Sequence, residues 1–236
     1  LGTVQLVVQK AAQLTLLSTE VVEDAVVDLL DYVIEHQARK FAWSIDRDGF
    51  LGDGTNTFGG VTGVSAALQA GSIVTAGGTT LGDIVLGDLH ECVGRVPMYE
   101  GFEGKWYMSH YTYHAAILPL LVSLGGTDMR QYEAGGQEML LGYPVEFTQV
   151  LPGQAAAAGD MVVVFGDLRL GMALGLRRTA TFRVLSELYA ASDQVAIQST
   201  IRRDIVTHSV GDATNAGAIT CIKLAATRAL AGSAKK

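Results

Sequence analysis

Hydrophobic and polar residues alternate near the start of the chain, between residues 3 and 17. The aliphatic positions Val4, Leu6 and Val8 are separated by glutamines such as Gln5 and Gln9. A period of two is typical of a strand with one exposed face. We therefore expect this segment to form an edge strand or one arm of a hairpin.

A long amphipathic helix is predicted directly after this strand. Ser18 or Thr19 can cap its first turn, in which Glu20, Glu23 and Asp24 meet the positive end of the helix dipole. Hydrophobic residues then recur at helical spacing for about 25 residues, which corresponds to a length of roughly 37 Å. Such a helix would form the spine of a domain.

The rest of the chain is predicted to mix short helices with short strands. The hydrophobic spacing and the Gly/Asp/Asn clusters place the boundaries. Helices are expected over residues 79–93 and 111–124, the second of them capped by Ser109. Strands are expected over residues 105–108, 140–145, 161–165, 179–185, 195–206 and 218–224, and a polar loop over residues 126–138.

The segment 46–61 is dense in turn-forming residues and is predicted to be a structural loop or hairpin. A calcium loop is excluded because Phe50, Leu51 and Thr57 stand where an EF-hand needs an oxygen ligand, a glycine and a glutamate. A phosphate-binding loop is excluded because the segment has no Gly-Lys-Ser/Thr.

The composition indicates a protein that covers part of its surface with other subunits. Charged residues make up 17% of the chain, against about 25% in an average protein, and the mean hydropathy is +0.28. No apolar run approaches the ~20 residues of a membrane span. We therefore expect no membrane partner, and we expect the surplus apolar surface to lie in contacts between copies.

The charges are unevenly distributed along the chain. Residues 1–118 contain 6 basic and 14 acidic residues, whereas residues 119–236 contain 11 and 10. This balance excludes a strongly basic nucleic-acid-binding protein. The basic residues concentrate at Arg177-Arg178, Arg183 and Arg202-Arg203. On a strand each adjacent pair should place one side chain on each face. Two interpretations remain: pairing with the acidic helix of a neighbouring copy, or ordinary surface arginines.

Candidate catalytic and metal-binding residues are sparse. His110 and His114 have the spacing of two metal ligands on a helix, but no acidic residue lies between or just after them. Cys221 could pair with His208 as a nucleophile, yet it lies in an apolar strand where a thiol is unreactive. We predict no catalytic, cofactor-binding or metal-binding residue and no enzyme. A metal-dependent soluble enzyme using the two histidines is the remaining alternative of that class.

A series of landmarks occurs in order along nearly the whole chain. They are residues 18–24 with the long helix, Gly52-Asp53-Gly54-Thr55, residues 105–109, Leu141-Gly142-Tyr143-Pro144-Val145, Val164-Phe165-Gly166-Asp167, and residues 195–204 with Arg202-Arg203-Asp204. Each landmark alone is weak, but their colinearity is specific. In this order they resemble the major capsid proteins of tailed bacteriophages with the Hong Kong 97 type fold.

The resemblance implies an α+β fold with two domains. The peripheral domain would comprise the long spine helix and an antiparallel sheet, from residues 18–72 and 191–236. A mixed α/β axial domain would span residues 73–190. Residues 1–17 would be the returning arm of an extended loop that overlaps a neighbour. An N-terminal arm and any scaffolding segment would then lie upstream of Leu1.

The resemblance also implies a function. The chain would be the major capsid protein of a tailed phage or prophage, assembled in the bacterial host cytoplasm into an icosahedral virion shell that encloses double-stranded DNA. Its partners would be copies of itself in pentamers and hexamers, scaffolding, portal and decoration proteins, and the DNA through non-specific contact. An encapsulin-like compartment, which loads enzymes, is the alternative within the same fold.

Two groups of residues carry these expectations at the residue level. The structural motif residues are Gly52, Asp53, Gly54, Gly142, Pro144, Gly166 and Asp167. The expected assembly contacts are Glu20, Glu23 and Asp24 on one side and Arg177, Arg178, Arg202 and Arg203 on the other.

Some members of the family crosslink their subunits through a lysine, an asparagine and a catalytic glutamate. Lys10 and Asn215 stand at matching places, but no glutamate follows Glu187. We therefore expect a shell held together by non-covalent overlap and charge pairing.

Overall fold

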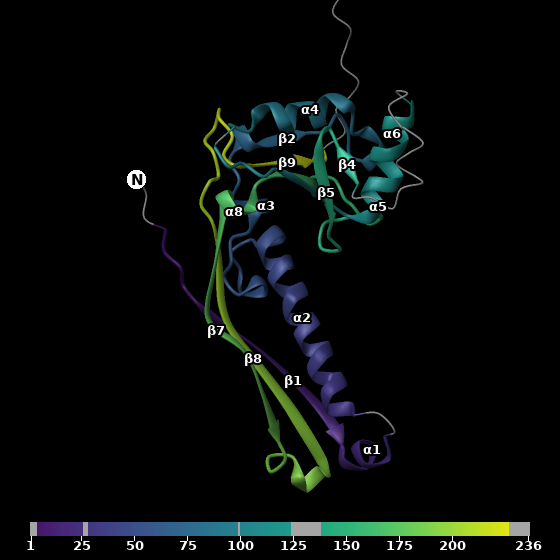
Figure 1. The fold of residues 1–236 in the computed structure, drawn as a ribbon, viewed down its shortest axis with the longest axis vertical. Coiled ribbons are helices and arrows are strands. Elements are labelled where there is room, and N and C mark those ends of the chain that lie inside the picture. Colours follow the sequence, from purple (N-terminus) through teal and green to yellow (C-terminus); the bar gives the residue numbers. More distant parts are fainter. Residues whose placement is uncertain (1–3, 26–27, 99, 124–137, 227–236) are drawn as a thin grey trace, which may run out of the picture. The chain divides into compact units, whose positions relative to one another are not determined.

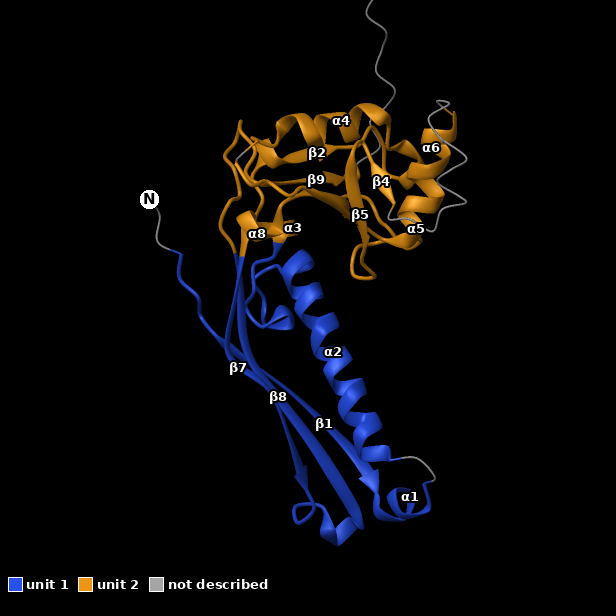
Figure 2. Cartoon of the chain, viewed as in Figure 1, with its two compact units in different colours: residues 1–63, 173–206 blue, residues 64–172, 207–236 orange. Residues whose placement is uncertain are grey.

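The computed structural model describes residues 4–25, 28–98, 100–123 and 138–226, and the chain divides into two compact units (Figure 1, Figure 2). Unit 1 contains residues 1–63 and 173–206, and unit 2 contains residues 64–172 and 207–236. The sequence-based domains differ in three places. They assigned residues 64–72 and the last strand to the domain of the long helix, and the strand that begins near residue 172 to the other domain. The strand pairing explains the placement of the two strands.

Unit 1 is built on a three-stranded antiparallel sheet. Its strands lie in the order β1 (Gln9–Ser18), β8 (Gln194–Thr207) and β7 (Met172–Leu185). The register of β1 against β8 runs from Gln9 opposite Arg203 to Ser18 opposite Gln194. The predicted strand is confirmed from Gln9 onward, and it is an edge strand. Its burial alternates, but the exposed face carries Leu14 and Leu16, whereas Gln13 and Thr15 are partly buried. Because β7 pairs with β8, it belongs to unit 1.

The predicted single helix is two helices, α1 (Thr19–Asp24) and α2 (Leu29–Leu51). The break is set by Asp28, whose backbone is extended and whose carboxylate accepts from the amides of Leu30 at 3.0 Å and Asp31 at 3.3 Å. This N-cap starts a new helix. At its other end α2 continues through residues 46–51, which the sequence analysis assigned to a loop.

Helix α2 runs along one face of the three strands (Figure 1). The buried hydrophobic residues of unit 1 come from α2, the loop that follows it and β8; they are Val33, Phe41, Phe50, Val61, Ala196, Ile197, Ile201 and Ile205. A buried glutamine joins the layers as well, because the Gln37 amide donates to Thr15 Oγ1 at 2.8 Å and to the Ile197 carbonyl at 3.2 Å. Helix α2 is therefore held on the sheet by hydrophobic packing and by the hydrogen bonds of the buried Gln37 side chain.

Unit 2 contains a six-stranded mixed sheet. Its strands lie in the order β2 (Ile73–Thr75), β9 (Ile219–Lys223), β6 (Met161–Gly166), β3 (Lys105–Met108), β5 (Tyr143–Phe147) and β4 (Met139–Leu140). The apolar strand β6 is buried at every residue, as its composition predicts for a central strand. Strand β9 pairs with β6 and β2, which places the last strand of the chain in unit 2.

The helical elements of unit 2 are short. Helix α4 lies against β2 and β9 in Figure 1, and a helical stretch with a π-helical turn follows β3. In that stretch Ser109 accepts from the amide of Thr112 at 3.1 Å, as its predicted cap requires. The elements are α3 (Val64–Ala67), η2 (Ala70–Ser72), η3 (Leu81–Asp83), α4 (Leu86–Arg95), α5 (His110–Thr112), η4 (Tyr113–Ile117), α6 (Leu118–Ser123) and α8 (Leu168–Gly171); in unit 1 they are α1, α2, η1 (Asn56–Phe58) and η5 (Ala190–Ser192).

The predicted loop at residues 126–138 lies outside the described residues except for Glu138. None of the described helices combines the length and the apolar character that a membrane crossing needs.

The core of unit 2 contains the largest buried side chain, Trp106. Its indole N–H donates to the Leu140 carbonyl at 2.9 Å, and its ring centroid lies 4.5 Å from that of Phe165. Both cysteines are also buried here. Burial raises the pKa of Cys221 to about 12 and raises that of Cys92 further, which confirms that Cys221 is an unreactive core residue.

Replacing Gly166 by alanine is expected to destabilise unit 2 by at least about 2 kcal/mol. Gly166 has a φ of +141°, and a Cβ there would collide with the Ala218 carbonyl just before β9. Backbone strain contributes about 1–3 kcal/mol and overpacking a similar amount. Labelling of the two buried cysteines by a thiol reagent measures the opening of unit 2, because both lie in its core.

Gly142→Ala is the matched control for Gly166→Ala. Gly142 also has a positive φ, +85°, but a Cβ there would have no atom within 4 Å. Gly142→Ala should therefore add backbone strain without a steric clash. Thiol labelling should accelerate less in this variant than in Gly166→Ala. Equal acceleration by the two substitutions would contradict the role of the Ala218 contact.

Candidate functional site

The sheet of unit 1 has two chemically different faces. One face packs on α2, and the other is the outer face. Arg203 points to the α2 side and is 5% exposed, whereas Arg202 is opposite Lys10 in the register and lies on the outer face. The predicted split of this arginine pair is therefore confirmed.

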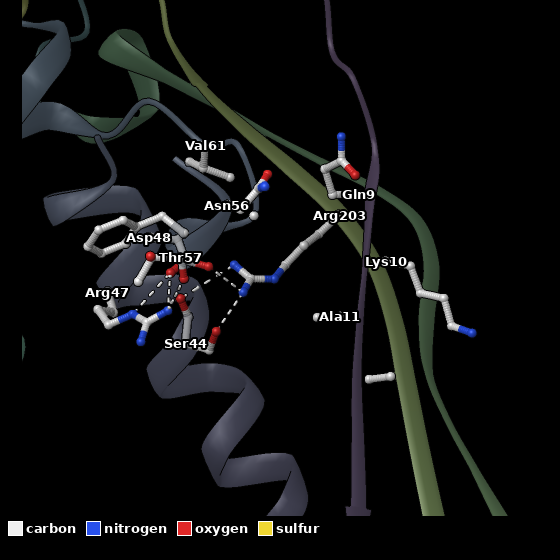
Figure 3. A pocket seen from close by; sticks show the side chains of 13 residues that line it. Gln9, Lys10, Ala11, Ser44, Arg47, Asp48, Asn56, Thr57, Val61 and Arg203 are labelled. Atoms are coloured by element: carbon white, nitrogen blue, oxygen red, sulfur yellow. Dashed lines mark hydrogen bonds and ion pairs between the residues drawn. The ribbon is translucent and has the colours of Figure 1, made fainter. Parts of the chain in front are cut away.

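The buried Arg203 of β8 belongs to an ion-pair cluster with Asp48 and Arg47 of α2 (Figure 3). Its Nη2 lies 2.6 Å from Asp48 Oδ2 and 2.7 Å from Ser44 Oγ. Arg47 pairs with the other carboxylate oxygen, with Nη2 2.9 Å from Asp48 Oδ1. Asp48 thus neutralises Arg203 inside the subunit. Arg203 was predicted as an assembly contact, and we do not retain it because this buried pairing occupies it.

Arg47 extends the cluster to the loop that follows α2. Its guanidinium lies over the rings of Trp43 at 5.3 Å and Phe58 at 5.1 Å, and its Nη2 donates to the Thr57 carbonyl at 3.1 Å. A cavity of about 250 Å³ lies between this cluster and β1. Arg47, Asp48 and Arg203 in its lining are paired with each other, so the arrangement serves to join α2, the loop and β8.

The outer face carries four cations from all three strands. Lys10, Arg178, Arg183 and Arg202 line a concave site of about 300 Å³ together with Thr181, Gln198 and Thr200. Among the described residues, none of the four makes an ion pair. We call these four residues the basic face. Arg177 is exposed but does not line this site.

The acidic residues predicted as contacts lie on α1. Glu20, Glu23 and Asp24 are exposed, and α1 contains no buried residue. No lysine or arginine occurs between residues 18 and 35. We call this range the acidic segment; its carboxylates are Glu20, Glu23, Asp24, Asp28, Asp31 and Glu35.

The first glycine motif closes the end of α2. Gly52 is its C-cap, and a Cβ at this position would collide with the carbonyls of Asp48 and Val61. Gly54 turns the chain back with a φ of +81°. Asp53 lies between the two glycines. Hydrogen bonds from the hydroxyl and the amide of Thr55 lower the pKa of its carboxyl group, and the Thr55 amide is 2.8 Å away.

Asp53 is expected to make unit 1 more sensitive to acid. Because its folded pKa lies below the unfolded value of about 3.9, its stabilisation is present above pH ~4 and is lost as the pH falls through the folded pKa. Urea unfolding followed by Trp43 fluorescence in a Trp106→Phe background measures this between pH 6 and 3. Asp53→Asn should show a smaller loss of stability over this interval. Parallel pH profiles would contradict the assignment.

The remaining motif residues lie in unit 2. Leu141 and Gly142, both with positive φ, form the tight turn between β4 and β5, and Pro144 follows in β5 opposite Met139. Asp167 is 4% exposed, and its carboxylate accepts from the amides of Arg169 at 2.9 Å and Glu103 at 3.1 Å. It therefore caps α8 and fixes the chain before β3.

The two histidines with metal-ligand spacing are close together but lack a third ligand among the described residues. The ring centroids of His110 and His114 are 4.3 Å apart, and both side chains are exposed. Within the part of the chain that the structure describes, no group of three or more His, Cys, Asp or Glu side chains could hold a metal ion. The metal-enzyme alternative gains no support from this geometry.

Sequence reasoning missed two features of these sites. Lys10 was not predicted as a contact, and Asp48 was not predicted as the partner of Arg203. The alternation of β1 was visible in the sequence. The register of β1 against β8 was not, and it is this register that brings Lys10 beside Arg202.

Solved structures with a similar fold are mainly phage capsids. The capsid of an empty GTA particle is 20% identical with a TM-score of 0.68, and the match covers 92% of this chain and 74% of that chain. The structure from Mycobacterium phage Adephagia is 18% identical with a TM-score of 0.64, covering 93% and 72%. The SrpI encapsulin complex of Synechococcus elongatus PCC 7942 is more distant, at 10% identity and a TM-score of 0.59, covering 92% and 73%.

These similarities confirm the predicted α+β capsid fold. No curated protein matches the chain by sequence. The sequence model described as the phage capsid family, however, matches residues 1–209. This chain therefore belongs to the phage capsid family.

Proposed function

We propose that this chain is the major capsid protein of a tailed phage or prophage, and that its copies form a closed icosahedral shell around double-stranded DNA. The observation that carries this proposal is the family match over residues 1–209, together with the two-unit fold shared with phage capsids. The role is structural, and we propose that the chain has no enzymatic activity.

Within the shell we assign different positions to the two units. Unit 1, with its long helix and three-stranded sheet, would be the peripheral domain. Unit 2, with the six-stranded sheet, would be the axial domain around the five-fold and six-fold positions. The boundaries are those of the structure, residues 1–63 with 173–206 and residues 64–172 with 207–236.

Other partners follow from the same proposal. The shell would assemble in the host cytoplasm with scaffolding, portal and decoration proteins. Contact with DNA would be weak and independent of sequence, because the chain has a net charge of −7.

Electron microscopy of the full-length protein tests this function. Expressed alone or with the scaffolding and portal proteins encoded beside it, the protein should form closed hollow particles. A protein that stays monomeric under both conditions would contradict the proposal. Particles that contain a cargo enzyme in place of DNA after isolation from infected or induced cells would favour an encapsulin-like compartment.

The shell should be free of covalent links between subunits. No glutamate follows Glu187, so Lys10 and Asn215 have no glutamate at the place where the crosslinking members of the family have their catalytic one. The Asn215 side chain is also engaged within the subunit, because its Nδ2 donates to the Asp212 carboxylate at 3.1 Å. Mature particles boiled in denaturant should therefore run on a gel as monomers. A ladder of covalent oligomers that survives reduction would contradict this prediction.

A further inference from the structure

We infer that the basic face of unit 1 is a docking site for the acidic segment of a second copy of this chain. The inference rests on the proposed shell function and specifies one contact within it.

The basic face is an organised site on the sheet. Lys10 and Arg202 are paired in the register of β1 and β8, and a hydrogen bond of 2.9 Å between the hydroxyls of Thr181 and Thr200 joins β7 to β8 at the same place. Four cations therefore converge on one concavity without a carboxylate in its lining. Their mutual repulsion is relieved when an anionic group covers them.

The outer face also has an aliphatic part, and this decides between two kinds of anionic partner. Leu14 and Leu16 alternate with the inward residues of β1, share the face of Lys10, and are 47% and 45% exposed. A nucleic-acid backbone could neutralise the cations but offers no aliphatic groups for the leucines. A protein segment that carries both carboxylates and aliphatic side chains fits both parts.

The acidic segment has these properties. On α1, the exposed carboxylates of Glu20, Glu23 and Asp24 accompany Val21, which is 54% exposed. A helix of six residues with no buried side chain is marginal in water and gains stability when it is covered.

The acidic segment cannot reach the basic face of its own chain along the strand that connects them. Lys10 and Ser18 lie near opposite ends of the uninterrupted strand β1, eight residues and roughly 26 Å apart. Helix α1 begins directly after Ser18. An acidic segment that covers the basic face therefore belongs to another copy.

Charge reversal in full-length protein tests this contact. R178E/R183E/R202E makes the basic face acidic, and E20K/E23K/D24K makes α1 basic. Each variant alone should give at least about tenfold fewer particles than wild type, because like charges then meet. Coexpression of the two variants, or all six substitutions in one chain, restores complementary pairs and should restore particles. Particle yield is measured by sedimentation and electron microscopy.

Two controls keep the outcomes separate. R177E is the matched control for R178E. Arg177 was also predicted as an assembly contact, but it does not line the basic face, so the inference expects R177E to leave particle yield unchanged. Wild-type assembly should also weaken at high NaCl, which requires no variant. The thermal midpoints of the monomeric variants establish that each one folds.

The results distinguish the inference from the proposed function. If wild type assembles and the reversed variants do not rescue each other, the inference is wrong and the shell function stands. Loss of packaged DNA in the R178E/R183E/R202E variant, with normal particle yield, would assign the basic face to nucleic-acid phosphates instead. If wild type forms no particles, both the inference and the proposed function are contradicted.

Discussion

Substitution of Asp48 by alanine is expected to lower the free energy of unfolding of unit 1 by about 3–5 kcal/mol. The substitution leaves Arg203, which is 5% exposed, as a buried charge without its carboxylate. Arg203 Nε already has no hydrogen-bond partner among the described residues, so the guanidinium would keep its neutral hydrogen bonds to Ser44 but no negative charge. Urea unfolding followed by Trp43 fluorescence in the Trp106→Phe background measures the loss, because Trp43 lies in unit 1.

Two comparisons establish that the effect comes from an uncompensated buried charge. Replacing both partners, as Asp48→Leu with Arg203→Met, should be less destabilising than Asp48→Ala alone, because no charge is left behind. Glu35→Ala removes the partner of Arg39 on the exposed side of α2 and should change stability by only about 0.5 kcal/mol or less. If Asp48→Ala costs no more than Glu35→Ala, the pair is not the anchor of α2.

Local patterns in the sequence were sufficient for several elements. The strand at β1, the apolar run of β6 and the cap at Ser109 each depend on residues close together in the chain, and the structure confirms all three. The alternation did not predict which face of β1 is exposed, because Leu14 and Leu16 point outward. The capsid fold was also predicted, because its landmarks keep their order along the chain.

The end of α2 shows why other features could not be predicted. Asp46, Asp48 and Gly49 have the propensities of a turn, yet they lie in the helix because Asp48 and Gly49 are buried there. Asp48 is held by Arg203, which is 155 residues away in sequence. A contact of this range overrides local propensity and leaves no periodic signal.

The division into units failed for a similar reason. Strand β9 has the same apolar character whether it joins one sheet or the other, and only its pairing with β6 and β2 assigns it to unit 2. The basic face depends on the same kind of information. The arginines are visible in the sequence as basic concentrations. The register of β1 against β8, however, decides that Lys10 lies beside Arg202 on the basic face, and Arg203 points to the opposite face of the sheet.

Trp106→Ala is expected to lower the stability of unit 2 by about 3–5 kcal/mol, the usual range for removing a fully buried tryptophan. The substitution leaves a cavity beside Phe165 and removes the hydrogen bond to the Leu140 carbonyl. Thiol labelling at Cys92 and Cys221 provides a readout that does not depend on tryptophan fluorescence. A loss of this size corresponds to labelling that is about 10²- to 4 × 10³-fold faster.

Trp106→Phe separates packing from hydrogen bonding at this position. Phenylalanine keeps an aromatic ring against Phe165 but leaves the Leu140 carbonyl without the indole donor, so we expect a loss of about 1–3 kcal/mol. Unit 1 should keep its stability in both variants, because its core residues come from α2, β8 and the loop that follows α2. If Trp43 fluorescence reports the same loss in unit 1 as thiol labelling reports in unit 2, the two units unfold together and the effect cannot be assigned to the Trp106 contacts alone.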